Sequence, residues 1–240
     1  MSFRNVALLI AVFLVQVFHA QSGHILPELA AKGRTLHEII PTDWKILLKA
    51  SGDLNGDGVE DLVVAIEGSK RKGLTKIQLS ERDTLEFKPR ILGIYFGKHN
   101  GKFKKKLQSN TFIVNHDSPT MDEPFKGLQI LPNGDLQIDF YIWRSRECTT
   151  WSSHEYIFRF QNRAFELVEY KESVTQRISA NEIYYNIDFQ NKTLKIITET
   201  RNEDDEPEYE ETLKKFELDH LKTIQSLGKP FEWKFQQLRI

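Results

Sequence analysis

The sequence predicts a mainly β fold of antiparallel hairpins and meanders, arranged as an incomplete propeller or a sandwich, with short helices near both ends. Three observations support this prediction. Short runs of β-branched and aromatic residues recur along the chain. Turn-forming residues such as Asn-Gly separate these runs. Between the runs, no helical pattern reaches the length of about ten residues that a parallel βαβ crossover needs.

The expected elements follow from apolar spacing and turn signals, in chain order. Segment 24–41 has helix-like apolar spacing, and a second helix is expected over 218–227. Between them, the β-rich runs predict strands over 44–50, 62–66, 90–96, 112–114, 127–131, 136–143, 155–160, 164–170, 183–189 and 193–198. Turn residues at 100–101, 132–135, 161–163 and 190–192 separate several of these strands into hairpins.

Charged runs mark the expected loops and edges. Seven acidic residues stand within the nine positions 203–211. Such a density of like charge is typical of a solvated segment, so we expect an exposed, mobile loop there. Lysine-rich runs at 70–72 and 104–106 are expected to face solvent beside strand edges.

Segment 53–61 contains the one motif whose residues indicate a specific chemistry. It reads Asp-Leu-Asn-Gly-Asp-Gly-Val-Glu-Asp, with oxygen-bearing side chains at positions 1, 3, 5 and 9 and glycine at position 6. Calcium takes about six to eight oxygen ligands, which a short loop of this kind can largely supply. The predicted calcium ligands are the side chains of Asp53, Asn55, Asp57 and Asp61 and the backbone carbonyl of Val59, with water completing the shell.

The loop differs from an EF-hand and from an ordinary turn. An EF-hand would place a glutamate at position 12 and continue into a helix. Position 12 here is Val64, inside the β-branched run 62–66, so the loop joins two strands. Asp, Asn and Gly also form plain hairpin turns. However, the three aspartates and Glu60 repel one another unless a cation neutralises them.

At residues 51–62 the chain resembles the calcium loops of FG-GAP and VCBS-type repeats, which build the blades of integrin α-subunit propellers and occur in many secreted bacterial proteins. The pattern D-x-[DN]-x-D-G-x-x-D, followed by a strand, matches from Asp53 to Asp61. Segments 91–97 and 100–103 are similar to the strand and turn that close such a blade. A second such loop does not occur, so the resemblance implies one calcium hairpin in a small exported bacterial protein rather than a seven-bladed propeller.

The first 22 residues have the features of a signal peptide. Arg4 precedes an apolar run over 6–18 that is shorter than a membrane-spanning helix, and Ala20 and Ser22 are both suitable cleavage positions. We therefore expect a secreted or periplasmic protein, with segment 23–240 forming a single β-rich domain. We expect the exported protein to have no internal disulfide, because Cys148 is the only cysteine.

Composition limits the classes of partner. The chain is 40% apolar and 11% aromatic, which is enough for a substantial core. Removing Arg4 from the 33 basic residues leaves a formal charge of −2 against 34 acidic residues. Such a nearly neutral chain gives no reason to expect nucleic acid or an anionic membrane as a partner.

Two further constellations could carry chemistry besides the loop. Trp143, Arg144 and Trp151 could line a carbohydrate or peptide groove, or the tryptophans could pack in the core. Cys148 and His154 could act as a thiol and its base, but no catalytic signature surrounds them. The sequence thus favours a calcium-stabilised, non-catalytic binding or structural module. The alternatives are an extracytoplasmic hydrolase of polysaccharide or peptide, and an inhibitor or partner of an exported enzyme.

Overall fold

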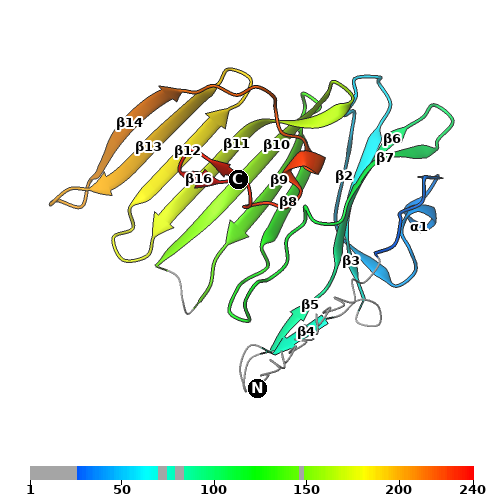
Figure 1. The fold of residues 1–240 in the computed structure, drawn as a ribbon, viewed down its shortest axis with the longest axis horizontal. Coiled ribbons are helices and arrows are strands. Elements are labelled where there is room, and N and C mark those ends of the chain that lie inside the picture. Colours follow the sequence, from blue (N-terminus) through cyan, green and yellow to red (C-terminus); the bar gives the residue numbers. More distant parts are fainter. Residues whose placement is uncertain (1–25, 70–74, 79–83, 146–148) are drawn as a thin grey trace, which may run out of the picture.

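Two large antiparallel sheets and two short hairpins make up the fold of the described residues (Figure 1). The computed structural model describes residues 26–69, 75–78, 84–145 and 149–240. The first sheet has the strand order β1-β7-β6-β3-β2 and the second has the order β14-β13-β12-β11-β10-β9-β8. The expected antiparallel, mainly β class is therefore confirmed, and the expected signal peptide and Cys148 lie outside the described residues.

The five-stranded sheet carries the predicted calcium loop. Its strands are β1 (Lys32–Gly33), β2 (Trp44–Gly52), β3 (Asp61–Gly68), β6 (Arg90–Gly97) and β7 (Phe103–Ser109). All eight residues of β3 are buried. Val63 and Ala65 belong to the main core, whereas Leu62, Val64 and Ile66 pack with Leu29 and Ile39 from the N-terminal segment. Burial on both faces explains why residues 62–66 are continuously apolar and do not alternate with polar residues.

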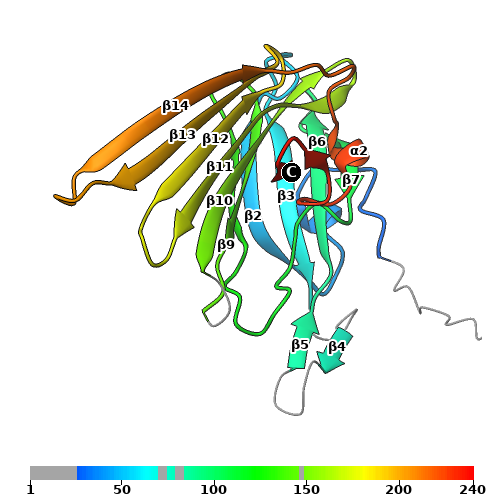
Figure 2. The ribbon, with the colours of Figure 1, turned by 60° about the vertical axis from the view of Figure 1, so that its left-hand side comes forward.

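The seven-stranded sheet is a meander in which each strand pairs with the next. It consists of β8 (Phe125–Ile130), β9 (Leu136–Ile142), β10 (Thr150–Gln161), β11 (Ala164–Gln176), β12 (Glu182–Asp188), β13 (Thr193–Arg201) and β14 (Pro207–Lys215). The strands curl like half of a barrel (Figure 2). A separate hairpin pairs β4 (Thr75–Gln78) with β5 (Thr84–Phe87).

The C-terminal segment packs across the seven-stranded sheet. It contains α2 (Ile224–Leu227) and the hairpin of β15 (Lys234–Phe235) with β16 (Leu238–Arg239). Its aromatic residues join the main core, where Phe231 lies 5.8 Å from Phe140 between ring centroids. The same core includes Val63 and Leu92 of the first sheet, so both sheets share one hydrophobic interior.

The two sheets adjoin along the edges formed by β2 and β8. A Cβ atom on Gly52 would lie 2.8 Å from the Ile130 side chain. At the turn after β8, Gly134 has φ +84°, and a Cβ atom there would lie 2.7 Å from the backbone oxygen of Asp53. The start of the predicted calcium loop therefore lies directly against the β8–β9 turn.

Several expected elements differ from the structure. In the described part of segment 24–41, helix is limited to the single turn α1 (Leu36–Ile39), which follows β1, and in segment 218–227 helix is limited to α2. Segment 112–114 is not a strand, because Phe112 fills the core edge-on against Tyr156 and Phe158. The predicted acidic loop is also wrong from residue 207 onward, where β14 begins. None of the helices in the described ranges is long and apolar enough to cross a bilayer.

Candidate functional site

The predicted calcium loop is shaped by its own side chains. Asp53 Oδ2 accepts a hydrogen bond from the Gly58 amide at 2.7 Å, and Oδ1 accepts one from the Gly56 amide at 2.8 Å. Both glycines have positive φ, +74° for Gly56 and +76° for Gly58, which glycine adopts without strain. The Gly58 hydrogen bond is the main cause that lowers the pKa of Asp53. Asp53 is therefore held as a carboxylate at the start of the loop.

The middle of the loop contains two Asx turns. Asn55 Oδ1 accepts from the Asp57 amide at 3.0 Å, and Asp57 Oδ1 accepts from the Val59 amide at 3.0 Å. In each turn, the side-chain oxygen accepts from the amide two residues further along the chain. Four of the five predicted ligands thus follow one another along a single tight loop.

Asp61 has a different environment because it begins β3 and is fully buried. Its Oδ2 accepts from the Leu54 amide at 2.9 Å and its Oδ1 from the Gly97 amide at 2.8 Å. Burial raises the pKa of Asp61, the two amides oppose this shift, and the charges of Asp57 and Asp53 add to it. Asp61 therefore fastens the loop to the end of β6 and carries unrelieved repulsion.

The donor chemistry of the loop suits calcium, since every polar side chain in it offers oxygen. The conformation, however, commits both oxygens of Asp61 to backbone amides. Across the described part of the chain, no three His, Cys, Asp or Glu side chains come together as a metal-binding group. A calcium ion would thus be held by Asp53, Asn55, Asp57 and the Val59 carbonyl, with Asp61 shared between the ion and the amides.

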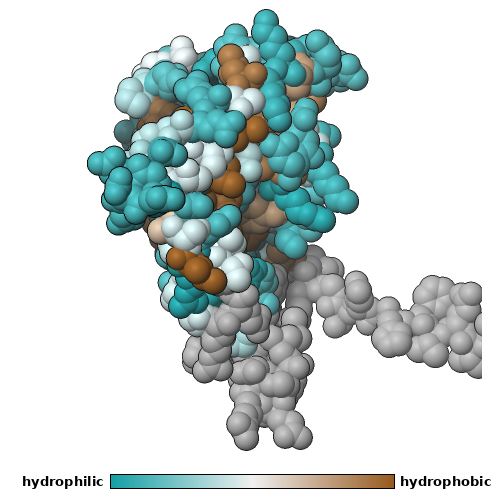
Figure 3. Space-filling model, turned by 90° about the vertical axis from the view of Figure 1, so that its left-hand side faces the viewer, coloured by the Kyte–Doolittle hydropathy of each residue, from teal (hydrophilic) through white to brown (hydrophobic). Residues whose placement is uncertain are grey.

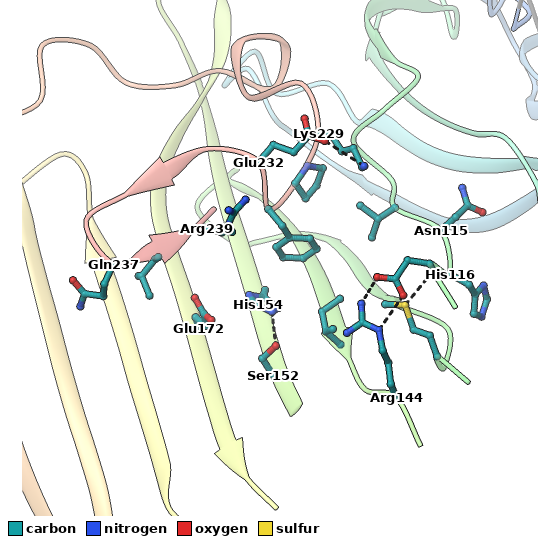
Figure 4. A pocket seen from close by; sticks show the side chains of 17 residues that line it. Asn115, His116, Arg144, Ser152, His154, Glu172, Lys229, Glu232, Gln237 and Arg239 are labelled. Atoms are coloured by element: carbon teal, nitrogen blue, oxygen red, sulfur yellow. Dashed lines mark hydrogen bonds and ion pairs between the residues drawn. The ribbon is translucent and has the colours of Figure 1, made fainter. Parts of the chain in front are cut away.

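A pocket of about 690 Å³ lies between the inner face of the curled sheet and the C-terminal segment (Figure 4). Strands β9 to β11 contribute Ile142, Ser152, His154 and Glu172 to its wall. The segment before β8 and the C-terminal hairpin close it from the other side. Apolar side chains form much of the lining: Val114, Met121, Ile142, Pro230, Phe231 and Leu238.

A chain of hydrogen bonds runs along one wall of the pocket. Ser152 Oγ lies 2.8 Å from His154 Nε2, and His154 Nδ1 lies 2.8 Å from the Tyr170 hydroxyl. The Tyr170 hydroxyl donates its one proton to Glu172 Oε2 at 3.1 Å. His154 Nδ1–H must then donate to Tyr170, which leaves Nε2 to accept from Ser152. Burial lowers the pKa of His154 to about 3, so the ring is neutral.

The charged groups of the pocket are mostly paired. Arg144 Nε donates to Asp117 Oδ1 at 3.0 Å, and Lys229 Nζ lies 3.3 Å from Glu232 Oε1. Arg239 forms no ion pair with any residue that the structure describes. Burial raises the pKa of the Glu172 carboxyl, and the hydrogen bond from Tyr170 opposes this shift. The pocket thus combines an apolar lining with an available guanidinium (Figure 4).

The structure brings only part of the predicted aromatic groove to this pocket. Arg144 lines it, but Trp143 and Trp151 do not. Trp151 precedes Ser152 in β10, and alternation along a strand turns it to the opposite face. His154 contacts Ser152 and Tyr170, and the predicted thiol partner Cys148 lies outside the described residues.

Sequence reasoning missed Ser152, Glu172 and Arg239. The spacing of Ser152 and His154 at alternate positions of a strand indicates a shared face. Glu172 lies opposite His154 in the β10–β11 ladder, and the Tyr170 hydroxyl links the two side chains. Arg239 arrives only through packing of the C-terminal hairpin, for which the sequence offers no local signal.

Comparisons of this chain with family models, curated proteins and solved structures gave no match.

Proposed function

We propose that this protein is an exported, calcium-stabilised β protein that acts as a non-catalytic binding module. The ligand is a small amphiphilic carboxylate, held in the pocket between the curled sheet and the C-terminal hairpin. The observation that carries this proposal is Arg239, a guanidinium without an ion pair among the described residues, beside an apolar lining. Pockets of this size that combine apolar walls with a few polar groups are the usual form of small-molecule sites.

The chemistry of the ligand follows from the pocket's groups. A guanidinium binds a carboxylate with two parallel, charge-assisted hydrogen bonds. Ser152 gives its proton to His154, so its oxygen lone pairs remain for a donor on the ligand. The Glu172 carboxylate lines the same pocket and opposes an anion there. The apolar side chains of the lining bind the hydrocarbon part of the ligand.

Binding of hexanoate and of hexan-1-ol, measured by calorimetry, tests this proposal. Arg239 is exposed, and an exposed ion pair contributes no more than about 1 kcal/mol, so we expect the acid to bind about 2- to 5-fold more tightly than the alcohol. Arg239→Gln should remove this preference, and Glu172→Gln should increase it. Lys98→Gln, which removes an exposed charge outside the pocket, is the control. Equal affinity for both probes, or no binding of either, contradicts the proposed ligand.

Calcium is proposed as a structural ion of the 53–61 loop. The ion would offset the repulsion among Asp53, Asp57 and Asp61 that contributes to the raised pKa of Asp61. Because Asp61 also bonds to Gly97 and the loop touches the β8–β9 turn at Gly134, such an ion would hold both sheets at one end. This arrangement supports a stabilising ion rather than a regulatory one.

Thermal melting with calcium and with a chelator tests the ion. With a dissociation constant on the order of 10 μM and about 1 mM calcium, binding adds about 2.7 kcal/mol to the free energy of unfolding. Asp57→Ala should abolish the response, whereas Asp122→Ala, an exposed aspartate outside the loop, should keep it. Identical melting curves in both conditions, with no heat of binding, would rule the ion out.

The hydrogen-bonded chain favours one second candidate function, ester hydrolysis at Ser152. Ser152 Oγ would attack the ester carbonyl while its proton passes to His154 Nε2. The carbon–oxygen bond to the leaving alcohol then breaks as His154 returns the proton to that alcohol. Water would release the acyl group as an acid by the same proton exchange. Tyr170 and Glu172 would fix the imidazole tautomer, as the third member of a serine triad does.

A fluorophosphonate probe separates this candidate from the binding module, because it labels only an activated serine. Under the hydrolase candidate, mass spectrometry should find one adduct on Ser152, lost in Ser152→Ala and in Tyr170→Phe. Ser153→Ala is the control, since Ser153 faces away from the pocket and bonds to Ser173 at 2.7 Å. If the probe does not label the protein, the hydrolase candidate is excluded and the non-catalytic binding module stands.

A further inference from the structure

Strand β14 is an open edge of the seven-stranded sheet. It pairs with β13 along nine residues and is the last strand in the order that the described residues form. Eight of its nine residues are exposed, and it lies at the far side of the sheet from β8 (Figures 1 and 2). An edge strand presents unpaired backbone donors and acceptors, which another strand can complete.

The charges along β14 are ordered by sign. Glu208, Glu210 and Glu211 lie in its first part, and Lys214 and Lys215 end it. If two copies of β14 pair antiparallel about Glu211, Glu208 of each copy lies opposite Lys214 of the other. Parallel, in-register pairing would instead place each charge beside its own copy. The strand is therefore complementary to itself in one orientation only.

The same antiparallel register joins the exposed apolar residues of the strand. Tyr209 is 65% exposed and Leu213 is 64% exposed, and they are two of the four large hydrophobic side chains that are exposed among the described residues. Both lie on one face, because they alternate with the residues between them. Pairing about Glu211 sets Tyr209 of each copy opposite Leu213 of the other, and aromatic–aliphatic cross-strand pairs stabilise sheets. Figure 3, seen from this side, shows hydrophobic side chains among hydrophilic ones.

The one unfavourable pair of this register is already compensated. Glu211 of each copy would lie opposite Glu211 of the other at the two-fold axis. Lys195 of β13 lies beside it, with Nζ 2.9 Å from Glu211 Oε2. The two lysines bring opposite charge to both glutamates at the axis, so their repulsion is reduced.

From these contacts we propose that two copies of this protein associate through β14, antiparallel about Glu211, and so continue the seven-stranded sheet into a second molecule. The interface is isologous, because each copy contributes the same strand. This inference is independent of the pocket and of calcium, since β14 belongs to neither.

Sedimentation velocity over a range of concentrations tests the dimer with two charge variants. Glu208→Lys and Lys214→Glu each place like charges opposite one another, so each variant alone should dimerise at least tenfold more weakly than the natural chain. In a mixture of the two variants, both lysines of one chain would lie opposite glutamates of the other, and the dimer should return as a heterodimer. Lys98→Glu, at an exposed position far from β14, is the control and should dimerise normally.

Circular dichroism of each variant verifies that the exposed substitutions leave the fold intact. A natural chain that stays monomeric at every concentration overturns the proposal. A dimer that both variants preserve, or that their mixture fails to restore, overturns this interface. Leu213→Ser gives an independent reading, because it removes the apolar pair without changing charge and should also weaken the dimer.

Discussion

At the scale of single residues, a buried ionic cluster links the two sheets. Arg90 of β6 is 3% exposed, and its Nε and Nη2 donate to Glu67 Oε2 at 3.1 and 2.9 Å. Its Nη1 and Nη2 also donate to the two oxygens of Glu123 at 2.7 Å. Burial would raise the pKa of Glu123, but the hydrogen bonds and charge of Arg90 lower it. Arg90 therefore joins the first sheet to the segment that leads into β8.

Replacing Arg90 by methionine should destabilise the protein by about 3–5 kcal/mol, because two carboxylates would lose their buried partner. Urea unfolding measures this loss. Lys45→Met is the matched control, since Lys45 also contacts Glu67, at 3.1 Å, but its side chain is 61% exposed. That change should cost no more than about 1 kcal/mol. Equal losses in both variants would contradict a special role for the buried guanidinium.

The burial of His154 predicts how the stability of the protein depends on pH. Burial lowers its folded-state pKa from 6.5 to about 3, so the unfolded chain binds a proton more readily than the folded one. Its contribution to stability is therefore complete above pH 6.5 and is lost as pH falls toward 3, at about 1.4 kcal/mol per pH unit. His154→Gln should show a shallower loss of unfolding free energy between about pH 6.5 and 4 than the natural chain. Ser153→Ala should keep the natural slope, and parallel slopes in all three would refute the assignment.

At the scale of elements, the C-terminal hairpin is both part of the core and part of the pocket. Phe235 is 7% exposed and lies 4.8 Å from Phe216 and 5.4 Å from Phe189 between ring centroids. Leu238 and Arg239, on the paired strand, line the pocket. Burial of one face of β15–β16 therefore fixes where Arg239 lies.

Phe235→Ala should cost about 3–5 kcal/mol of unfolding free energy, since it opens a cavity among aromatic rings. The same change should weaken hexanoate binding, because the hairpin that carries Arg239 loses its anchor. Denaturant unfolding and calorimetry measure the two effects. Lys98→Ala, at an exposed position outside the hairpin and the pocket, should change neither. Loss of stability with intact binding would separate the hairpin from the pocket.

At the scale of the whole molecule, one hydrophobic core spans both sheets. Val63 and Leu92 of the first sheet belong to the same cluster as Phe140 and Phe158 of the second. The second cluster, around Leu29 and Ile39, covers only the outer face of the first sheet. Neither sheet can therefore keep its interior covered without the other.

This shared core predicts a single unfolding transition. Two variants, each with one of the four tryptophans, report on different parts: Trp44 begins β2, and Trp233 precedes the C-terminal hairpin. Fluorescence of both should change at the same urea concentration, because the sheets unfold together. Far-ultraviolet circular dichroism of each variant provides the reference curve. Two separate midpoints would show that the sheets unfold independently.

The sequence predicted much of the fold and less of the site. Alternation identified most strands of the meander, and the run 62–66 was correctly placed after the 53–61 loop. The prediction from sequence was wrong at Phe112, whose apolar neighbours suggested a strand. It was also wrong at β14, whose acidic start suggested a loop. An edge strand exposed on both faces needs no alternating apolar pattern, so β14 has no hydrophobic signal of its own.

The sequence by itself determined the antiparallel class and the spacing of oxygen groups in the 53–61 loop, because both depend on neighbouring residues. Only the tertiary structure decided that the two sheets share a core and that the second sheet curls. It also decided that Ser152, His154, Glu172 and Arg239 meet in one pocket. These residues come from β10, β11 and β16, and their meeting depends on strand register and on the packing of the C-terminal hairpin. Such long-range contacts arise from burial of the whole chain and have no local pattern.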